Sequence, residues 1–247
     1  MAKKWIITIL SFSVLSLTFA AGNKTVKLTN RGKAFIEKFV PIIYEQNTAV
    51  LEKRNRVIGI REYFYYTGNL SVENRKFLIR TAAEYDLENY EITFENYRQD
   101  ILDATKQLLD RVDIVPIRMI LAQAIIETAW GKSSAAQATN NYFGITCRCN
   151  SGHLVTSSAT TNYYLKPYET LEEGIADYIH LLNTKRSYQK FRDLRNYCRE
   201  NNLPLRDEVL TAGLLKYSEL GEVYIAKINH VIRKYLRNEA IQASINV

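Results

Sequence analysis

One glutamate in this 247-residue chain stands where a carboxylic acid can hold a proton near neutral pH. Glu127 ends a run of residues, Ile117–Ile126, whose only polar members are Arg118 and Gln123. A helix that is apolar nearly all round is a buried helix. A carboxyl group at the end of such a helix loses water, which disfavours its charged form and raises its pKa. That property suits a general acid, which gives a proton to a leaving oxygen.

The same pattern has explanations that involve no chemistry. Glu127 could pair with a buried arginine or reach solvent at the helix end, and structural ion pairs also shift pKa values. Ile120, Gln123 and Ala124 precede Glu127 by seven, four and three residues, so they share its face of the helix. Periodicity alone therefore leaves catalysis as one hypothesis among three.

Three sequence motifs favour the catalytic hypothesis. The segment Ala122–Ser133, in which Glu127 is followed by Thr-Ala-Trp-Gly, resembles the hallmark of the glucosaminidase family of peptidoglycan hydrolases, glycoside hydrolase family 73. Asn140–Ile145 (NNYFGI) and Tyr164–Tyr168 (YLKPY) are similar to two further motifs of that family. The resemblance is strong over residues 113–182 and weaker to about residue 235. The helical N-terminal region and Cys147-Arg148-Cys149 are most similar to a Bax-like subgroup.

The resemblance implies a lysozyme-like fold, in which a helical lobe carries the acid and a small β-lobe lies across a groove. It also implies cleavage beside N-acetylglucosamine in the glycan strands of peptidoglycan, with Glu127 as the proton donor. For Trp130 and Phe143, packing in the core is the simpler alternative to contact with a sugar. The residues expected to bind substrate are Trp130, Asn141, Tyr142, Phe143, Tyr164, Tyr168 and Tyr224.

The chain departs from the usual glycosidase pattern, which uses two carboxylates. No Asp or Glu occurs from Thr128 to Tyr168, so the expected β-lobe carboxylate is missing. Either the 2-acetamido group of the substrate acts as nucleophile, or a carboxylate from elsewhere enters the site. Glu169 is the nearest in sequence, whereas Glu173 completes a capping box with Thr170. We favour a site with one carboxylate, aided by tyrosines.

The elements that must position these residues are mainly helices, which predicts an α+β fold. Residues 22–112 are expected to form a helical N-terminal region, and residues 113–247 the glucosaminidase domain. Within the first region, Pro41 is expected to open a helix, and Ser71 and Thr93 to cap two more. The second is expected to contain strands at 153–156 and 161–165, a turn at 150–152, and helices starting near Pro116 and Thr170 and covering 188–200, 207–217 and 222–237.

The first 21 residues have the pattern of a signal peptide. Lys3 and Lys4 precede an apolar stretch, and Thr18–Gly22 is small enough for cleavage. An uncleaved anchor is the alternative, but the stretch is short and contains hydroxyl residues. We therefore expect an exported protein, periplasmic or associated with the cell wall, without a stable membrane anchor. The net charge of +7 suits an anionic polymer or mere solubility, and export argues against nucleic acid as a partner.

The three cysteines, Cys147, Cys149 and Cys198, allow one disulfide and one free thiol, but their spacing leaves the pairing open. Cys147 and Cys149 lack the spacing of paired zinc ligands, so we expect neither a metal nor a cofactor. Two alternatives to the glucosaminidase hypothesis remain. One is a lytic transglycosylase on the same fold, and the other is a wall-binding protein without catalysis.

Overall fold

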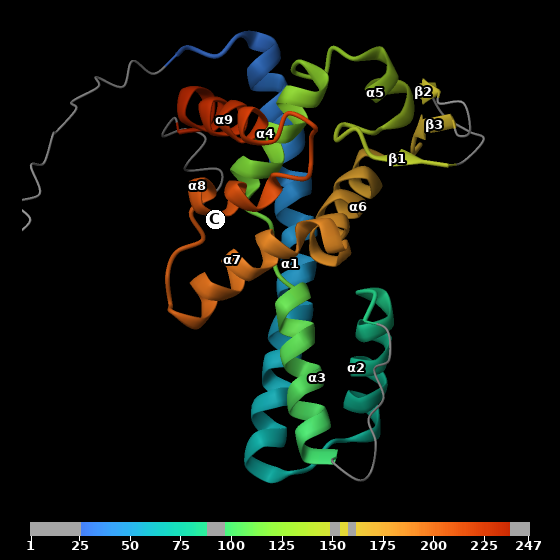
Figure 1. The fold of residues 1–247 in the computed structure, drawn as a ribbon, viewed down its shortest axis with the longest axis vertical. Coiled ribbons are helices and arrows are strands. Elements are labelled where there is room, and N and C mark those ends of the chain that lie inside the picture. The colour runs from blue at the N-terminus through green and yellow to red at the C-terminus, as the bar shows by residue number, and fades with distance from the viewer. Residues whose placement is uncertain (1–25, 88–96, 149–153, 158–161, 238–247) are drawn as a thin grey trace, which may run out of the picture.

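The computed structural model describes residues 26–87, 97–148, 154–157 and 162–237. The expected signal peptide, the Thr93 cap and the turn at 150–152 lie outside these residues. The molecule has a narrow part built by three helices and a broader part that contains the remaining helices and a small sheet (Figure 1). The helix α1 (Asn30–Thr67) runs through both parts, and α2 (Val72–Glu84) and α3 (Tyr97–Arg111) complete the narrow one.

The broader part surrounds the helix α4 (Ile117–Thr128), which is the buried helix expected from the sequence. Its residues Met119, Ile120 and Leu121 are completely buried. The helices α1 and α9 pack directly against it. The other elements of this part are α5 (Ser134–Thr139), α6 (Leu171–Thr184), α7 (Gln189–Glu200), α8 (Asp207–Leu210), α9 (Glu222–Val231), the 3₁₀ segments Arg186–Tyr188 and Thr211–Leu214, and the π-helical segment Ile232–Leu236.

The expectation that Pro41 opens a helix is wrong, because α1 begins at Asn30 and passes through Pro41. The side chain of Thr29 caps the true start by accepting a hydrogen bond from the Gly32 amide at 3.1 Å. A proline within a helix removes one backbone hydrogen bond. Phe39 and Ile43, on either side of Pro41, are both buried. Burial of this continuous apolar face offsets the lost hydrogen bond.

The sheet has three short antiparallel strands in the order β1-β3-β2. The strands β2 (Leu154–Ser157) and β3 (Asn162–Leu165) confirm the two predicted β runs, whereas β1 (Thr146–Cys147) was not predicted because it has only two residues. Tyr164 in β3 is paired with Cys147 in β1 and with Leu154 in β2. The mainly helical α+β class is therefore confirmed.

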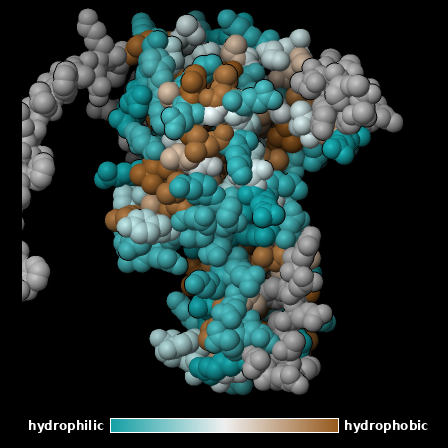
Figure 2. Space-filling model, in the orientation of Figure 1, coloured by the Kyte–Doolittle hydropathy of each residue, from teal (hydrophilic) through white to brown (hydrophobic). Residues whose placement is uncertain are grey.

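The apolar side chains form two cores. The larger core lies around α4, and the smaller one joins α1 to α2 and α3 through Val57, Leu78 and Leu108. On the face drawn in Figure 2, hydrophobic residues gather over the broader part, and the narrow part is mostly hydrophilic. Within the described residues, no helix has an apolar stretch long enough to span a membrane.

A buried ion cluster joins the two parts at Asp113, between α3 and α4. The Arg199 guanidinium donates from Nε and Nη2 to the two Asp113 oxygens at 2.9 and 2.8 Å. Arg54 of α1 and Arg195 of α7 lie 3.5 and 3.8 Å from Oδ2. Burial alone would raise the pKa of Asp113, but Arg195, Arg199 and Arg54 together outweigh it and lower that pKa. The cluster therefore links α1 and α7 to Asp113, which lies just before the start of α4.

We predict that Asp113→Asn lowers the free energy of unfolding by about 3–5 kcal/mol, because it leaves buried arginines without their counter-charge. The pKa of Asp113 is lowered in the folded protein, so its ionic contribution is present above the unfolded pKa and is lost as the pH falls through the folded one. The difference between variant and wild type should therefore shrink in acid. Urea denaturation at several pH values measures this, and the exposed Asp103→Asn on α3 is the control. Equal loss in both variants would contradict a special role for Asp113.

Candidate active site

Glu127 lies in the last turn of α4 and receives a hydrogen bond from α9. The Tyr224 hydroxyl donates to Glu127 Oε1 at 2.7 Å. The same hydroxyl accepts a hydrogen bond from Gln123 Nε2 at 3.2 Å. The amide of Gln123 is held in turn by the hydroxyl of Tyr178, which donates to Oε1 of that amide. The single proton of Tyr224 is thus directed at Glu127, because its acceptor side is already occupied by Gln123.

The pKa of Glu127 is raised above the ordinary value of a glutamate. The first cause is burial of the carboxyl among protein atoms, and the hydrogen bond from Tyr224 and the charge of Lys227 oppose it. Solvent nevertheless reaches a substantial part of the Glu127 side chain. The carboxyl group is therefore crowded enough by protein to favour its protonated form and still open enough to meet a ligand.

Gly144 keeps one side of this carboxyl open. It has a φ of +68°, a conformation that residues with a side chain rarely adopt, and a Cβ there would lie 3.5 Å from Glu127 Oε2. The loop around Gly144 is held by the buried Asn141, whose side chain donates to the carbonyls of Ile145 and Lys166 at 2.8 and 2.9 Å. Its Oδ1 accepts from the amides of Phe143 and Ile145. Asn141 was expected to bind substrate, but its side-chain oxygen and nitrogen form hydrogen bonds with the backbone of this loop and of Lys166.

Two of the other expected substrate-binding residues lie in the core. Phe143 is 1% exposed and stacks on Tyr178 with ring centroids 4.1 Å apart. Tyr142 is 6% exposed and packs its ring edge-on against Phe39 of α1 at 5.0 Å. The Phe143 carbonyl accepts a hydrogen bond of 2.5 Å from Tyr217, and the Tyr217 ring stacks on Tyr224. These aromatics connect the Gly144 loop to Tyr224 and thereby fix both around Glu127.

The remaining expected residues lie in different places. Tyr164 is half-buried in β3, and Trp130 is half-buried against Phe35 and Tyr235. The hydroxyl of Tyr168 donates to Asp177 of α6 at 2.5 Å. Tyr168 lines a cavity of about 750 Å³ between α1, α6 and the segment after β3. The structure brings Tyr224 to Glu127 directly, but it places Tyr168 at this separate cavity.

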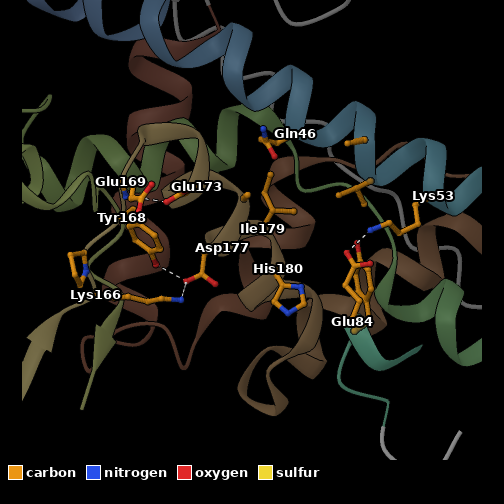
Figure 3. A pocket seen from close by; sticks show the side chains of 15 residues that line it. Gln46, Lys53, Glu84, Lys166, Tyr168, Glu169, Glu173, Asp177, Ile179 and His180 are labelled. Carbon is orange, nitrogen blue, oxygen red and sulfur yellow. Dashed lines mark hydrogen bonds and ion pairs between the residues drawn. The ribbon is translucent and has the colours of Figure 1, made fainter. Parts of the chain in front are cut away.

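Figure 3 shows this cavity, whose charged residues are largely paired with one another. Lys166 and Tyr168 both reach Asp177, and Lys53 of α1 pairs with Glu84 of α2. Glu127 is not among the lining residues, although the cavity is large. The cavity and the Glu127 carboxyl group are therefore separate places in the structure.

Among the described residues, no acidic group contributes to the shift in the pKa of Glu127. Glu169, the first acidic residue after Glu127 in the sequence, lines the 750 Å³ cavity. Glu173 accepts a hydrogen bond from the Glu169 amide, and its own amide donates to Thr170 Oγ1, which confirms the expected helix cap. Among the described residues, Tyr224 is the tyrosine that bonds to the Glu127 carboxyl, and Tyr178 and Tyr217 lie behind it.

Sequence reasoning singled out Glu127 and Tyr224, which the structure brings together, but it assigned no role to Gln123 or Tyr178. A usable signal existed for Gln123, because a polar residue four positions before Glu127 on an apolar helix must find a buried partner. Tyr178 was expected only as part of the family-like segment that follows Tyr168, because its hydrogen bond to Gln123 forms only in the folded chain. Of the cysteines, Cys147 is disulfide-bonded and Cys198 is a buried free thiol.

Residues 102–237, more than half of the chain, match the model of the glucosaminidase family, described as mannosyl-glycoprotein endo-β-N-acetylglucosaminidase. The chain therefore belongs to the glucosaminidase family and is a glycoside hydrolase. The protein bax of Escherichia coli (strain K12) is 29% identical to it over 216 residues, which are 87% of this chain and 73% of that protein. These matches confirm the resemblance to the glucosaminidases and to their Bax-like subgroup.

A solved structure, the catalytic domain of the autolysin Auto from Listeria monocytogenes, aligns with 95% of this chain and 99% of its own. The sequence identity is 17% and the TM-score is 0.43.

We predict that Tyr224→Phe moves the basic limb of the pH–rate profile to higher pH and lowers kcat about tenfold. The hydrogen bond from Tyr224 lowers the pKa of Glu127, so its removal raises that pKa further and destabilises the carboxylate that forms after proton transfer. The pH profiles of kcat and kcat/KM on soluble glycan fragments measure both effects.

The matched control is Tyr217→Phe, which removes a hydroxyl from the stacked neighbour that bonds to the Phe143 carbonyl and not to Glu127. Its basic limb should stay at the wild-type position. A Tyr224→Phe limb that stays in place or moves to lower pH would show that Tyr224 does not stabilise the carboxylate.

Proposed function

We propose that this chain is an endo-β-N-acetylglucosaminidase that cleaves the glycan strands of peptidoglycan, with Glu127 as the general acid. The observation that carries the proposal is the asymmetry of the Glu127 carboxyl. Oε1 accepts the Tyr224 hydrogen bond, whereas Oε2 faces the position that Gly144 leaves free. A proton on this carboxyl is therefore held on Oε2, on the side that a substrate can approach.

In the first step, Glu127 Oε2 gives its proton to the glycosidic oxygen while the bond from that oxygen to C1 breaks. The leaving sugar departs as an alcohol, and positive charge develops on C1 of the N-acetylglucosamine. The carboxylate that remains keeps the hydrogen bond from Tyr224, which stabilises the new negative charge. The raised pKa keeps the proton on Glu127 before the transfer, and the hydrogen bond from Tyr224 stabilises the carboxylate after it.

The second step needs a nucleophile, and we propose that the 2-acetamido oxygen of the substrate supplies it. This oxygen attacks C1 and closes a five-membered oxazolinium ring. Water then opens the ring at C1, and the Glu127 carboxylate takes the proton released by that water. The absence of an acidic group among those that shift the pKa of Glu127 supports this route within the described residues.

A lytic transglycosylase is the second candidate, and the single carboxylate favours it equally. In that reaction an oxygen of the muramic acid attacks its own C1, so no water is used and the new end is an anhydro-sugar. The family match favours hydrolysis beside N-acetylglucosamine. Mass spectrometry of borohydride-reduced fragments separates the two, because only hydrolysis leaves a reducing end that gains two hydrogens.

Peptidoglycan lies outside the cytoplasm, so the proposed substrate requires an exported enzyme. The signal-peptide pattern of residues 1–21 supports export to the periplasm or cell wall, followed by cleavage near Ala21 or Gly22. We propose residues 22–112 as a helical region that supports a lysozyme-like domain at 113–247. The family match itself begins earlier, at residue 102 within α3.

We predict that Glu127→Gln lowers the rate of peptidoglycan clearing at least about a hundredfold, because the amide keeps the shape of the side chain and has no proton to transfer. The variant should be folded and no less stable than wild type at neutral pH. The raised pKa of Glu127 means that its ionised form destabilises the fold once the pH exceeds the unfolded value. Turbidity of purified peptidoglycan and thermal melts measure the two effects, and wild-type clearing by the variant would refute the assignment.

We predict that Glu169→Gln keeps most of the activity, and that a thiazoline mimic of the oxazolinium ring inhibits the enzyme strongly. Species that resemble the reaction intermediate bind more tightly than substrate. Glu173→Gln is the control for the α6 cap and should cost about 0.5–2 kcal/mol of stability at most, with little loss of rate. A folded but inactive Glu169→Gln, together with no thiazoline inhibition, would replace the acetamido route by a second carboxylate.

A further inference from the structure

A cavity of about 460 Å³ lies beside the turn that follows α4 and has no role in the chemistry described above. Trp130, three residues after Glu127, forms one of its walls. The start of α1 and the end of the π-helical segment form the others. Its lining residues are Val26, Lys27, Leu28, Thr29, Arg31, Trp130, Lys132 and Tyr235.

An unusual turn directs Trp130 into this cavity. Ala129, Trp130 and Gly131 have φ values of +48°, +64° and +70°, and a left-handed conformation is costly for residues that carry a Cβ. Thr128 holds the turn, because its carbonyl accepts from the Lys132 amide at 2.8 Å and its hydroxyl accepts from the Gly131 amide at 2.9 Å. The turn ends the catalytic helix and carries the indole away from it, towards the start of α1.

The charged residues of the cavity are all basic. Lys27, Arg31 and Lys132 are exposed, and none of them forms an ion pair with any residue that the structure describes. No acidic side chain is among the lining residues. Three unpaired cations around one cavity create a positive potential that attracts anions, and an arginine binds a carboxylate through two parallel hydrogen bonds. The cavity therefore suits an anionic ligand.

The cavity also has an aromatic side. The rings of Trp130 and Tyr235 pack edge to face, with centroids 5.3 Å apart, and both are half-buried. Such rings offer apolar surface together with a polar N–H or O–H group. A ligand that combines a carboxylate with short aliphatic side chains would satisfy both sides of the cavity. A small inorganic anion would use only the basic side.

We propose that this cavity binds the peptide stem that hangs from the glycan strand, through the carboxylates of that stem. This inference rests on the proposed function, since it takes peptidoglycan as the substrate. The stem is joined to the lactyl group of muramic acid, next to the N-acetylglucosamine on which Glu127 acts. An extended peptide spans about 3.3–3.6 Å per residue. Because only three residues of chain separate Glu127 from Trp130, the distance between them is no longer than an extended peptide of about three residues. A stem of a few residues is therefore long enough to pass from Glu127 to this cavity.

The sequence supplies a direct reporter for this cavity, because the chain has two tryptophans, Trp5 and Trp130. In the full chain with Trp5→Phe and Glu127→Gln, Trp130 is the only tryptophan and the glycan is not cut. We expect a saturable change in its fluorescence with a disaccharide-tetrapeptide. The same disaccharide without peptide should give no such change at equal concentration.

Changing Arg31 and Lys132 together to Gln in this background should weaken binding of the disaccharide-tetrapeptide at least about fivefold. Changing Lys190 and Lys216 to Gln, which removes the same charge at exposed positions outside the cavity, should leave the affinity as it was. Thermal melts show that each variant is folded. Added salt should weaken binding to the parent and have less effect on the Arg31/Lys132 variant.

Three results would overturn the inference. One is an equal response to the disaccharide without peptide, and another is unchanged affinity in the Arg31/Lys132 variant. The third is saturation by inorganic phosphate at the same concentration as the peptide-bearing ligand, which would identify a general anion site. None of these depends on catalysis, so they are distinct from failure of the proposed function, which would appear as undiminished clearing of peptidoglycan by Glu127→Gln.

Discussion

The burial of α4 is the constraint on which the rest of this structure depends. Its residues face protein on nearly every side, and each fully buried large aliphatic side chain contributes about 1.5–3 kcal/mol relative to an exposed one. The entry to the helix is fixed by Asn47 of α1, whose side-chain amide exchanges two hydrogen bonds with the backbone of Val115. Asp113 and its arginines hold the segment just before that. The position of Glu127 therefore follows from packing along the whole helix and not from contacts at its end alone.

Burial also explains why the polar residues of α4 are few and paired. A polar side chain in such a helix must find a partner, and Gln123 finds two in Tyr178 and Tyr224. This arrangement orients the hydroxyl of Tyr224 towards Glu127. The hydrogen bond from Tyr224 helps to hold α9 against α4. The same bond occupies Oε1 of the Glu127 carboxyl group.

Several features were predictable from the sequence because they are local. The apolar run before Glu127, the caps at Ser71 and Thr170 and the two longer β strands all depend on neighbouring residues, and the structure has them. The continuation of α1 through Pro41 was not predictable in this way. It depends on apolar residues on both sides of the proline that are buried only once the other helices are in place.

The same distinction between local and long-range features applies to the candidate site. Glu127 was singled out because the apolar run and the motif that mark it lie within one helix and the turn after it, and Tyr224 was named only through the resemblance to the family. Asn141 and Tyr168 have side chains that could bind a sugar. In the structure, however, Asn141 donates to the Ile145 carbonyl and Tyr168 donates to Asp177. Hydrogen bonds between distant segments decide which polar residues remain available, and a single sequence does not contain that information.

The central claim is that the fold keeps Glu127 protonated above the pH at which a glutamate ordinarily ionises. A ¹³C NMR titration of the side-chain carboxyl groups tests it most directly, with the Glu127 signal assigned by its absence from the spectrum of Glu127→Gln. The structure predicts a midpoint above the ordinary value of about 4.3. A midpoint at or below that value would mean that burial does not hold the proton in place, and it would contradict the proposed role of Glu127 as the general acid.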